Sequence, residues 1–380
     1  MSAEGVPAGW VRPGGVGTGS WSVGALYRRL MCTGGDVREA QVAGPRPVVG
    51  EAADPITLGP VDEVRVTTLV DNVYDGLLPG DDVVARAGIG HRVAAPQFDG
   101  GATIVGLLAE HGFSALIEVR RGDRRSTVLF DTGLSPDAMV ENADRMQVSF
   151  EAVQATVLSH GHFDHTGGLA GLAARRGRAG MPLTVHPGLW TRRRLTLPGA
   201  GDLELPTLSR AALESEGFEV VERRVPSLLL DGCVLVTGEI DRTTEFERGM
   251  PPAHQAWDGT AWRHDPLVID DQALVVDVRG RGLVVVTGCG HAGVVNIVRQ
   301  AMRLTGVGRL AGLVGGFHLG GPAFEPIIAP TVAAIEQWAP SLVVPGHCTG
   351  WRAQHALAAQ LPDAWTAGSS GSTYTVHAAN

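Results

Sequence analysis

The sequence contains no lysine, and all 31 of its positively charged side chains other than histidine are arginine. Without a lysine ε-amine the protein cannot form a Schiff base, use a lysine general base or build a phosphate loop of the Gly-Lys-Ser/Thr type. The sequence therefore excludes several common enzyme mechanisms before any motif is considered.

Cysteine and long apolar runs are also scarce. Four cysteines in 380 residues are too few for a disulfide framework, which is typical of a reducing compartment. No apolar run approaches the ~18–20 residues that cross a bilayer, and the first residues lack the charged and apolar regions of an export signal. We therefore predict a cytoplasmic protein with no membrane partner.

Acidic residues outnumber basic residues, 40 to 31, so the formal net charge is −9. Affinity for nucleic acid depends on cations that neutralise phosphates, so this balance disfavours a nucleic-acid partner. The run Arg192–Arg194 is expected to be a solvated surface feature. We predict a small-molecule substrate.

The chain divides into an extension and one domain. Residues 1–60 are rich in Gly, Pro and Ala without periodicity, and we predict that they are disordered. In residues 61–380, strands are expected at 64–70, 115–119, 127–130, 155–158, 183–186, 219–222, 234–237, 273–278, 283–287, 310–314, 342–344 and 373–376, and helices at 136–146, 167–176, 292–304, 326–338 and 351–361. Residues 241–270, which are mostly polar and include Pro251 and Pro252, are interpreted as a loop insertion that covers the site.

Four metal-ligating residues follow the strand expected at 155–158. They are His160, His162, Asp164 and His165. Alternate residues of an extended segment point to the same side, so the first two histidines can hold one ion while Asp164 and His165 turn toward a second. Imidazole and carboxylate hold zinc at ~2.0–2.2 Å, and two ions ~3.5–4 Å apart are typical of hydrolytic sites. The motif predicts a binuclear metal centre.

Three later strands each end in a glycine followed by a histidine. These histidines are His291, His318 and His347. The carboxyl ends of strands are where open α/β folds gather their ligands, so we expect His291 and His347 to bind metal. Cys289 is a candidate thiolate ligand, with an inert buried thiol as the alternative. Because the ligand set is then nearly filled, His318 is predicted to bind substrate or to act as a general acid.

Polar residues also end earlier strands. Asp71 and Asn72 are predicted to contact substrate or to orient a ligand histidine, although such residues are also ordinary turn formers. Asp131 has the same alternatives. His186, which precedes a proline, is predicted to be structural.

These motifs together resemble the metallo-β-lactamase superfamily, whose signature His-x-His-x-Asp-His matches residues 160–165 at every defined position. The segments 69–72, 130–133, 288–293, 316–319 and 347–350 are similar to one subgroup of predicted metal-dependent hydrolases. Some members of that subgroup carry the label ribofuranosyl-aminobenzene 5'-phosphate synthase. The resemblance spans residues 62–378 and implies an α/β fold, namely the αββα sandwich of two mixed sheets flanked by helices, with metals at one edge.

The sequence departs from the superfamily pattern in its second half. The resemblance implies a third histidine, a bridging aspartate and a final histidine after the first motif. The strand ending at Thr237 is followed only by Glu239 where the third histidine is expected, and Cys289 occupies the region of the aspartate. The predicted ligands therefore include His291, His347 and, as the open choice, Cys289, whereas Glu239 is left out.

The resemblance and the motif favour a metallo-hydrolase. Two divalent ions, Zn²⁺ in the first place with iron or manganese as alternatives, would share a water whose pKa falls from about 15.7 toward ~7. The resulting hydroxide would attack an ester, lactone or phosphoester, with Asp164 managing the proton and His318 polarising the scissile group. The alternatives are a phosphoribosyl-type transferase, an iron-dependent oxidoreductase with the same ligands, and a non-catalytic metal-binding protein.

Overall fold

The computed structural model describes residues 54–177, 180–197, 199 and 201–379. The disorder predicted for residues 1–60 concerns mainly 1–53, which lie outside the described residues. Residues 54–60 pack against the domain: Leu58 is buried, and the Ile56 amide donates a hydrogen bond of 2.7 Å to the Leu304 carbonyl. The packed structure therefore begins a few residues before Val61.

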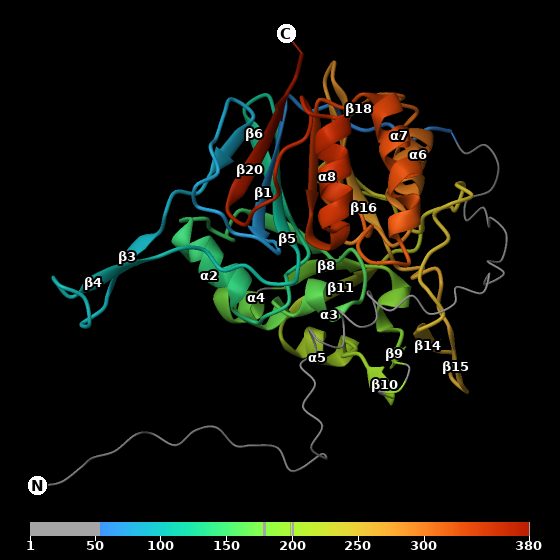
Figure 1. The fold of residues 1–380 in the computed structure, drawn as a ribbon, viewed down its shortest axis with the longest axis horizontal. Coiled ribbons are helices and arrows are strands. Elements are labelled where there is room, and N and C mark those ends of the chain that lie inside the picture. Colours follow the sequence, from blue (N-terminus) through green and yellow to red (C-terminus); the bar gives the residue numbers. More distant parts are fainter. Residues whose placement is uncertain (1–53, 178–179, 198, 200, 380) are drawn as a thin grey trace, which may run out of the picture.

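Two sheets packed face to face form the centre of the molecule (Figure 1). The first has the order β11 (Phe218–Glu222), β8 (Met181–Val185), β7 (Val153–Val157), β6 (Arg124–Phe130), β5 (Ser114–Arg121), β1 (Glu63–Val70), β20 (Ser372–His377) and β2 (Val84–Arg86). The second has the order β12 (Ser227–Leu229), β13 (Val234–Val236), β16 (Ala273–Val278), β17 (Gly282–Thr287), β18 (Leu310–Gly316) and β19 (Leu342–Gly346).

Alternating side chains of the strands form the layer between the sheets. Val66 and Ile117 project from the first sheet, and Val276 and Val284 project from the second, all of them fully buried. Because side chains alternate along a strand, the other faces are apolar as well and require cover. Burying a Val, Leu or Ile side chain stabilises a fold by roughly 1.5–3 kcal/mol, so both faces of each sheet contribute.

Helices cover the two outer faces. The second sheet is covered by α6 (Val294–Thr305), α7 (Ile328–Trp338) and α8 (Trp351–Gln360). The first sheet is covered by α2 (Ala138–Arg145), α4 (Leu169–Arg176) and α5 (Arg210–Ser215). The short helical turns are α3 (Phe163–Thr166), η1 (Pro187–Trp190), η2 (Glu325–Ile327) and η3 (His347–Thr349). The predicted αββα sandwich is confirmed.

The strand directions place the functional segments at one edge. Strands β6, β7 and β8 run parallel, and β17, β18 and β19 run parallel in the other sheet. Strand β1 is antiparallel to β5, which is antiparallel to β6, so β1 and β6 end at the same edge. The segments that follow these strands carry nearly all the predicted site residues.

The segment 241–270 is not the plain loop that we predicted. It contains β14 (His254–Trp257) and β15 (Trp262–His264), which join β9 (Arg193–Leu197) and β10 (Gly201–Glu204) in a four-stranded sheet of order β10-β9-β14-β15. These strands are too short, and too interrupted by polar residues, to give an alternating apolar pattern.

Away from this edge, the hairpin of β3 (His91–Ala94) and β4 (Ala102–Val105) projects from the body of the molecule (Figure 1). Within the described ranges, no helix combines the length and the apolar character that crossing a membrane requires.

Candidate metal centre

The segment that carries the first motif is extended directly after β7 and then forms the short helix α3. His162 is the N-cap of α3 with extended backbone angles, and Asp164 and His165 lie inside that helix. The change from extended to helical backbone turns Asp164 and His165 away from His160 and His162. Gly167 allows the chain to pass close by, since a Cβ there would lie 1.7 Å from the Leu134 carbonyl oxygen. Local sequence thus sets two ligand directions within six residues.

Three buried imidazoles form a first group of ligand atoms. The Nε2 atom of His291 lies 3.2 Å from Nε2 of His160 and 3.1 Å from Nδ1 of His162. Nitrogen atoms that share one tetrahedral zinc ion at ~2.0–2.1 Å lie about 3.3 Å apart. We call His160, His162 and His291 the first group; their spacing suits one ion.

A second group lies directly beside the first. Its members are Asp164, His165, Cys289 and His347, whose ligand atoms are all within 4.8 Å of one another. The Sγ atom of Cys289 is 3.2 Å from Nε2 of both His165 and His347, and these two nitrogens are 3.1 Å apart. Cys289 also forms a possible metal group with His160 and His291. Its sulfur is therefore common to both groups.

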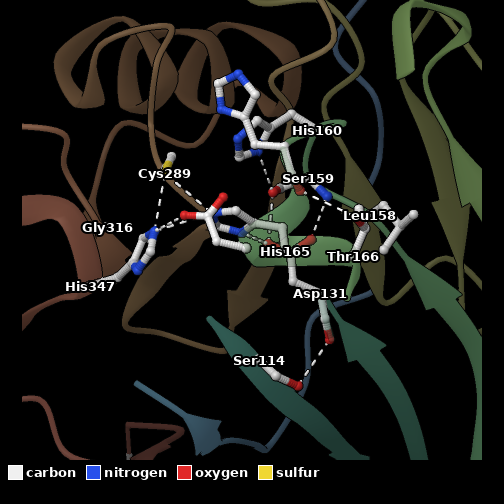
Figure 2. A network of polar contacts seen from close by, with 12 residues as sticks. Ser114, Asp131, Leu158, Ser159, His160, His165, Thr166, Cys289, Gly316 and His347 are labelled. Atoms are coloured by element: carbon white, nitrogen blue, oxygen red, sulfur yellow. Dashed lines mark hydrogen bonds and ion pairs between the residues drawn. The ribbon is translucent and has the colours of Figure 1, made fainter. Parts of the chain in front are cut away.

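Asp131 anchors both groups from behind (Figure 2). The Nδ1 atom of His165 donates to Oδ2 of Asp131 at 2.7 Å, and Oδ2 also accepts from the Ser159 hydroxyl at 2.7 Å. The Ser159 oxygen in turn accepts from Nδ1 of His160 at 2.9 Å. Because a carboxylate can only accept, both histidines present an unprotonated Nε2 to the site.

Asp71 and Asn72 hold the last ligand histidine. Nδ1 of His347 donates to Oδ1 of Asn72 at 3.2 Å, and Asn72 donates to the His347 carbonyl at 3.0 Å. Oδ1 of Asp71 accepts from the His347 amide at 2.7 Å. Of the two roles that we expected for this pair, these contacts fit the orienting one, with Asp71 buried behind His347, and contact with substrate stays a prediction.

Neither ring nitrogen of the buried His318 makes a hydrogen bond among the described residues, and its ring lies beside the thiols of Cys289 and Cys348 in a third group of possible metal ligands. The φ of 46° at His318 is left-handed, and its ring lies 4.2 Å from the His291 ring and 4.5 Å from the Phe324 ring. Buried nitrogens without partners and left-handed backbone each cost free energy and are concentrated at functional sites. His318 is thus in place to bind something other than the protein.

A cavity of about 620 Å³ reaches both His291 and His318. Its walls are mostly apolar and include Phe246, Met250, Pro322, Phe324 and Ile327, and its charged members are Arg248, Glu245 and Glu247. Ligand pockets typically combine apolar walls with a few polar groups that fix orientation. The cavity gives a small molecule access to the edge of the first group.

Burial keeps the first group uncharged. Desolvation, assisted by neighbouring positive groups, lowers the pKa values of His160, His162 and His291 well below the usual histidine range. Neutral imidazole is the form that binds metal. Desolvation likewise raises the pKa of Cys289 well above the usual thiol range, so this thiol requires a cation nearby to ionise.

In the second group, neighbouring charges shift the pKa values of His347 and Asp164 in the direction opposite to desolvation. Burial lowers the pKa of His347, but the charge of Cys348 and a hydrogen bond with Asp164 raise it, to about 9. Burial raises the pKa of Asp164, but His165 and His347 lower it further, so that the net shift is downward. An ion bound here would replace the proton of His347.

Sequence reasoning missed His254, whose Nε2 lies 3.0 Å from Nε2 of His162. Arg193, which we expected on the solvated surface, is instead buried and paired with Asp270, and Asp270 accepts from the Gly161 amide at 2.8 Å and so holds the turn between His160 and His162. These residues are distant in sequence from the motif and belong to short strands or loops. No local pattern identified them.

The residues that we left out of the ligand set lie elsewhere. Glu239 accepts a hydrogen bond of 3.2 Å from the buried His186 and forms an ion pair with Arg224, whose side chain is half exposed. Neither His186 nor Glu239 belongs to a group of metal-ligating atoms in the described part of the chain. The third imidazole of the first group comes instead from His291, two residues after Cys289.

The fold and the ligand groups define an α/β sandwich protein with metal-ligating side chains at one edge of its sheets. The chain belongs to the metallo-β-lactamase superfamily, whose family model matches residues 109–300. Membership of this superfamily supports an enzyme and a metal-dependent hydrolase in general, and the superfamily usually binds metal ions.

Individual relatives are more distant. A protein of Methanocaldococcus jannaschii named 7,8-dihydropterin-6-methyl-4-(beta-D-ribofuranosyl)-aminobenzene-5'-phosphate synthase is 29% identical over 250 residues, which cover 65% of this chain and 83% of that protein. An uncharacterized protein of the same organism is 29% identical over 247 residues, which cover 64% of this chain and 86% of that protein. A crystal structure described as a metal-dependent hydrolase of the β-lactamase superfamily has a TM-score of 0.61 at 23% identity, covering 83% of this chain and all of that one. At 23% identity, the similarity to this crystal structure supports the fold of the chain and carries no statement about its reaction.

Proposed function

We propose that this protein is a metal-dependent hydrolase that acts on a small-molecule ester, lactone or phosphoester. The observation that carries the proposal is the pair of adjacent buried ligand groups that share Cys289, with the unpartnered His318 beside them. Among the described residues, no contact gives this buried cluster a purely structural role.

The residues present fit divalent metal ions. The first group offers three neutral nitrogens, and the second offers nitrogen, carboxylate oxygen and sulfur, a mixture that suits zinc better than magnesium or calcium. Bound divalent ions would lower the pKa of a water and polarise the oxygen of the scissile group. Hydrogen bonds that the rings of His165 and His347 donate to Asp131 and Asn72 hold these rings in the required tautomers.

The protein side chains supply orientation and hydrogen bonds. His318 faces the cavity and can donate a hydrogen bond to the carbonyl or phosphoryl oxygen of a substrate, which satisfies one of its two unpartnered nitrogens. Asp164, whose pKa is shifted downward so that it remains ionised near neutral pH, can accept a hydrogen bond from the attacking water and orient it. The apolar wall around Phe246 and Phe324 excludes water from the substrate.

A transferase reaction of the phosphoribosyl type is the second candidate. It is favoured by the name of the 29% identical relative, which is a synthase of a ribofuranosyl phosphate compound. In this chain Arg248 lines the cavity and could receive a phosphate, although Glu245 and Glu247 line the same cavity. Both reactions would use the same two ligand groups.

Metal analysis and a substrate screen test the proposal. The protein purified from its own host is analysed for metals, and the zinc-loaded protein is assayed against esters, lactones, phosphodiesters and RNA. We expect bound zinc and hydrolysis of at least one small-molecule class that a chelator abolishes and zinc restores. Bound iron without zinc, or transfer to an amine acceptor without hydrolysis, would contradict the hydrolase.

A further inference from the structure

His254 lies against the metal centre although it belongs to the segment that we interpreted as a covering loop. It is fully buried on β14, and its Nε2 atom lies 3.0 Å from Nε2 of His162. The two rings are nearly perpendicular, with centroids 5.2 Å apart and an angle of 71° between their planes. Edge-on contact between two ring nitrogens at this distance is a hydrogen bond rather than packing.

The direction of this hydrogen bond follows from the other side of His254. Its Nδ1 atom lies 3.0 Å from the backbone carbonyl oxygen of Asp265, and a carbonyl can only accept. A neutral His254 therefore carries its proton on Nδ1 and offers an unprotonated Nε2.

The unprotonated Nε2 of His254 in turn determines which ring nitrogen of His162 carries the proton. Since Nε2 of His254 accepts, Nε2 of His162 must carry the proton, which leaves Nδ1 of His162 unprotonated. That Nδ1 is the atom that lies 3.1 Å from Nε2 of His291, inside the first group. In water the opposite tautomer, with Nδ1 protonated, is also populated and could not bind an ion there.

We propose that His254 is a positioning residue that selects the ligating tautomer of His162, so that the strand pair β14–β15 supports the first metal-binding group. The proposal rests on the metal-dependent function proposed above. It assigns to residues 254–265 a role in building the centre rather than in covering it.

The surroundings of His254 keep it in place. Strand β14 pairs with β9 through His254 and Leu195, and the adjacent Arg193 forms ion pairs with Asp265 and Asp270. Asp270 holds the Gly161 amide, so the same network fixes both the backbone before His162 and the ring behind it. This double attachment pre-organises the ligand before an ion arrives.

His254 is a neutral hydrogen-bond partner of a ligand histidine, whereas the partners of His165 and His160 involve the Asp131 carboxylate. His165 is held by the Asp131 carboxylate, and His160 is held by a serine that is itself bonded to Asp131. A neutral imidazole accepts a hydrogen bond without adding negative charge, so the first group remains a set of three neutral donors. We therefore expect the loss of His254 to weaken the first group without changing the second.

The experiment compares His254→Leu with His254→Gln in the full chain. Leucine fills the space without an acceptor, whereas the Gln Oε1 atom can accept from His162 near the original position. Outputs are the zinc affinities from competitive titration and, in metal-free protein, the imidazole nitrogen spectrum of His162 by NMR. His160→Ala identifies the binding step that belongs to the first group, and His355→Leu, on the exposed side of α8, controls for the loss of a histidine.

We expect His254→Leu to weaken the first binding step by roughly 10–100-fold and to leave the second step unchanged. The Gln variant should restore most of the affinity. In the metal-free spectrum, His162 should be protonated on Nε2 in the wild type and in the Gln variant, and should show mixed tautomers in the Leu variant.

Equal zinc affinity in the Leu variant and the wild type would overturn the proposal, and so would mixed tautomers of His162 in the wild type. Equal losses in the Leu and Gln variants, with circular dichroism unchanged, would also overturn it, because they would show that an acceptor is not what matters. The metal-free spectrum tests the tautomer directly, so its result is distinguishable from a failure of the metal-dependent function itself.

Discussion

Asp131 and His165 are joined by a hydrogen bond of 2.7 Å from Nδ1 to Oδ2, and the same oxygen accepts the Ser159 hydroxyl that supports His160. One carboxylate thus sets the tautomer of a ligand in each group. The left-handed φ of 59° at Asp131 is the backbone cost of bringing the carboxylate to this position.

The first prediction concerns this shared anchor. Asp131→Asn keeps the size of the side chain, and asparagine tolerates a left-handed backbone, so the fold should persist. Both carboxylate oxygens of Asp131 accept, Oδ2 from the Ser159 hydroxyl and His165 and Oδ1 from the Ser159 amide, so the NH₂ group of asparagine leaves at least one of these donors without an acceptor. We expect zinc affinity to fall by roughly 10–100-fold at both groups, measured by titration. Asp123→Asn, in an exposed hairpin turn, is the control, and a loss confined to one group would contradict the shared role.

Cys289 provides the second prediction. Because its Sγ lies 3.2 Å from Nε2 of both His165 and His347, Cys289→Ala removes a donor from the second group. Because the sulfur also lies beside the first group, we expect weaker zinc binding at both groups, with the larger loss at the second, since the first keeps its three imidazoles. The control is Cys233→Ala, which removes a buried thiol from the layer between the sheets. Unchanged binding of both ions would show that the Cys289 thiol is inert.

The third prediction separates substrate binding from metal binding at His318. His318→Asn preserves the left-handed backbone and removes the imidazole. On the best substrate of the screen, we expect kcat to fall by roughly 10²–10⁴-fold, with zinc content unchanged. Loss of an ion from this variant would instead make His318 a metal ligand.

Close packing behind the centre yields the fourth prediction. A Cβ at Gly288 would lie 2.1 Å from Oγ of Ser159 and 2.6 Å from Oδ2 of Asp131. Gly288→Ala should therefore displace the Asp131 network and reduce zinc affinity more than overall stability, which titration and thermal unfolding measure separately. Gly308→Ala is the matched control, because its Cβ would meet nothing within 4 Å. Equal behaviour of the two variants would mean that the network adjusts freely.

The fifth prediction is a pH dependence of stability. Burial raises the pKa of Glu247 to about 7, although the amides of Val295 and Asn296 donate to it and lower the pKa. The folded state therefore binds the proton more tightly than the unfolded state, whose pKa is near 4.5. The stability from this group is fully present below about pH 4.5 and is lost as the pH rises through about 7, by an amount of up to about 3 kcal/mol.

Urea unfolding at pH 5 and pH 8, with a chelator present, measures this effect. Glu247→Gln mimics the protonated carboxyl, so the variant should lose less stability between these pH values than the wild type. Glu151→Gln, at an exposed position, should follow the wild type. A wild type and a Glu247→Gln variant with the same pH slope would refute the raised pKa.

Much of the sandwich could be predicted because its long strands and helices have clear periodicity. The strand expected at 64–70 is β1, Glu63–Val70, and the helix expected at 292–304 is α6, Val294–Thr305. The pairs β9–β10 and β14–β15 could not be predicted in this way. Their strands have three to five residues, and most of their side chains are only partly buried, so pairing with distant chain rather than local pattern determines them.

The sequence alone determined which side chains could bind metal. His160, His162, Asp164 and His165 follow one strand, and the spacing within an extended segment and a helical turn fixes their directions locally. The glycines and histidines after β17, β18 and β19 indicated further ligands at the same edge for the same reason.

Only the tertiary structure decided how these side chains are grouped and supported. It placed His291 with the first group, set the Cys289 sulfur between the groups, paired Glu239 with His186, and brought His254 to the back of His162. These contacts join residues that are 53 to 131 positions apart. They depend on the register of strands in two different sheets and on their packing, which no local spacing in the sequence encodes.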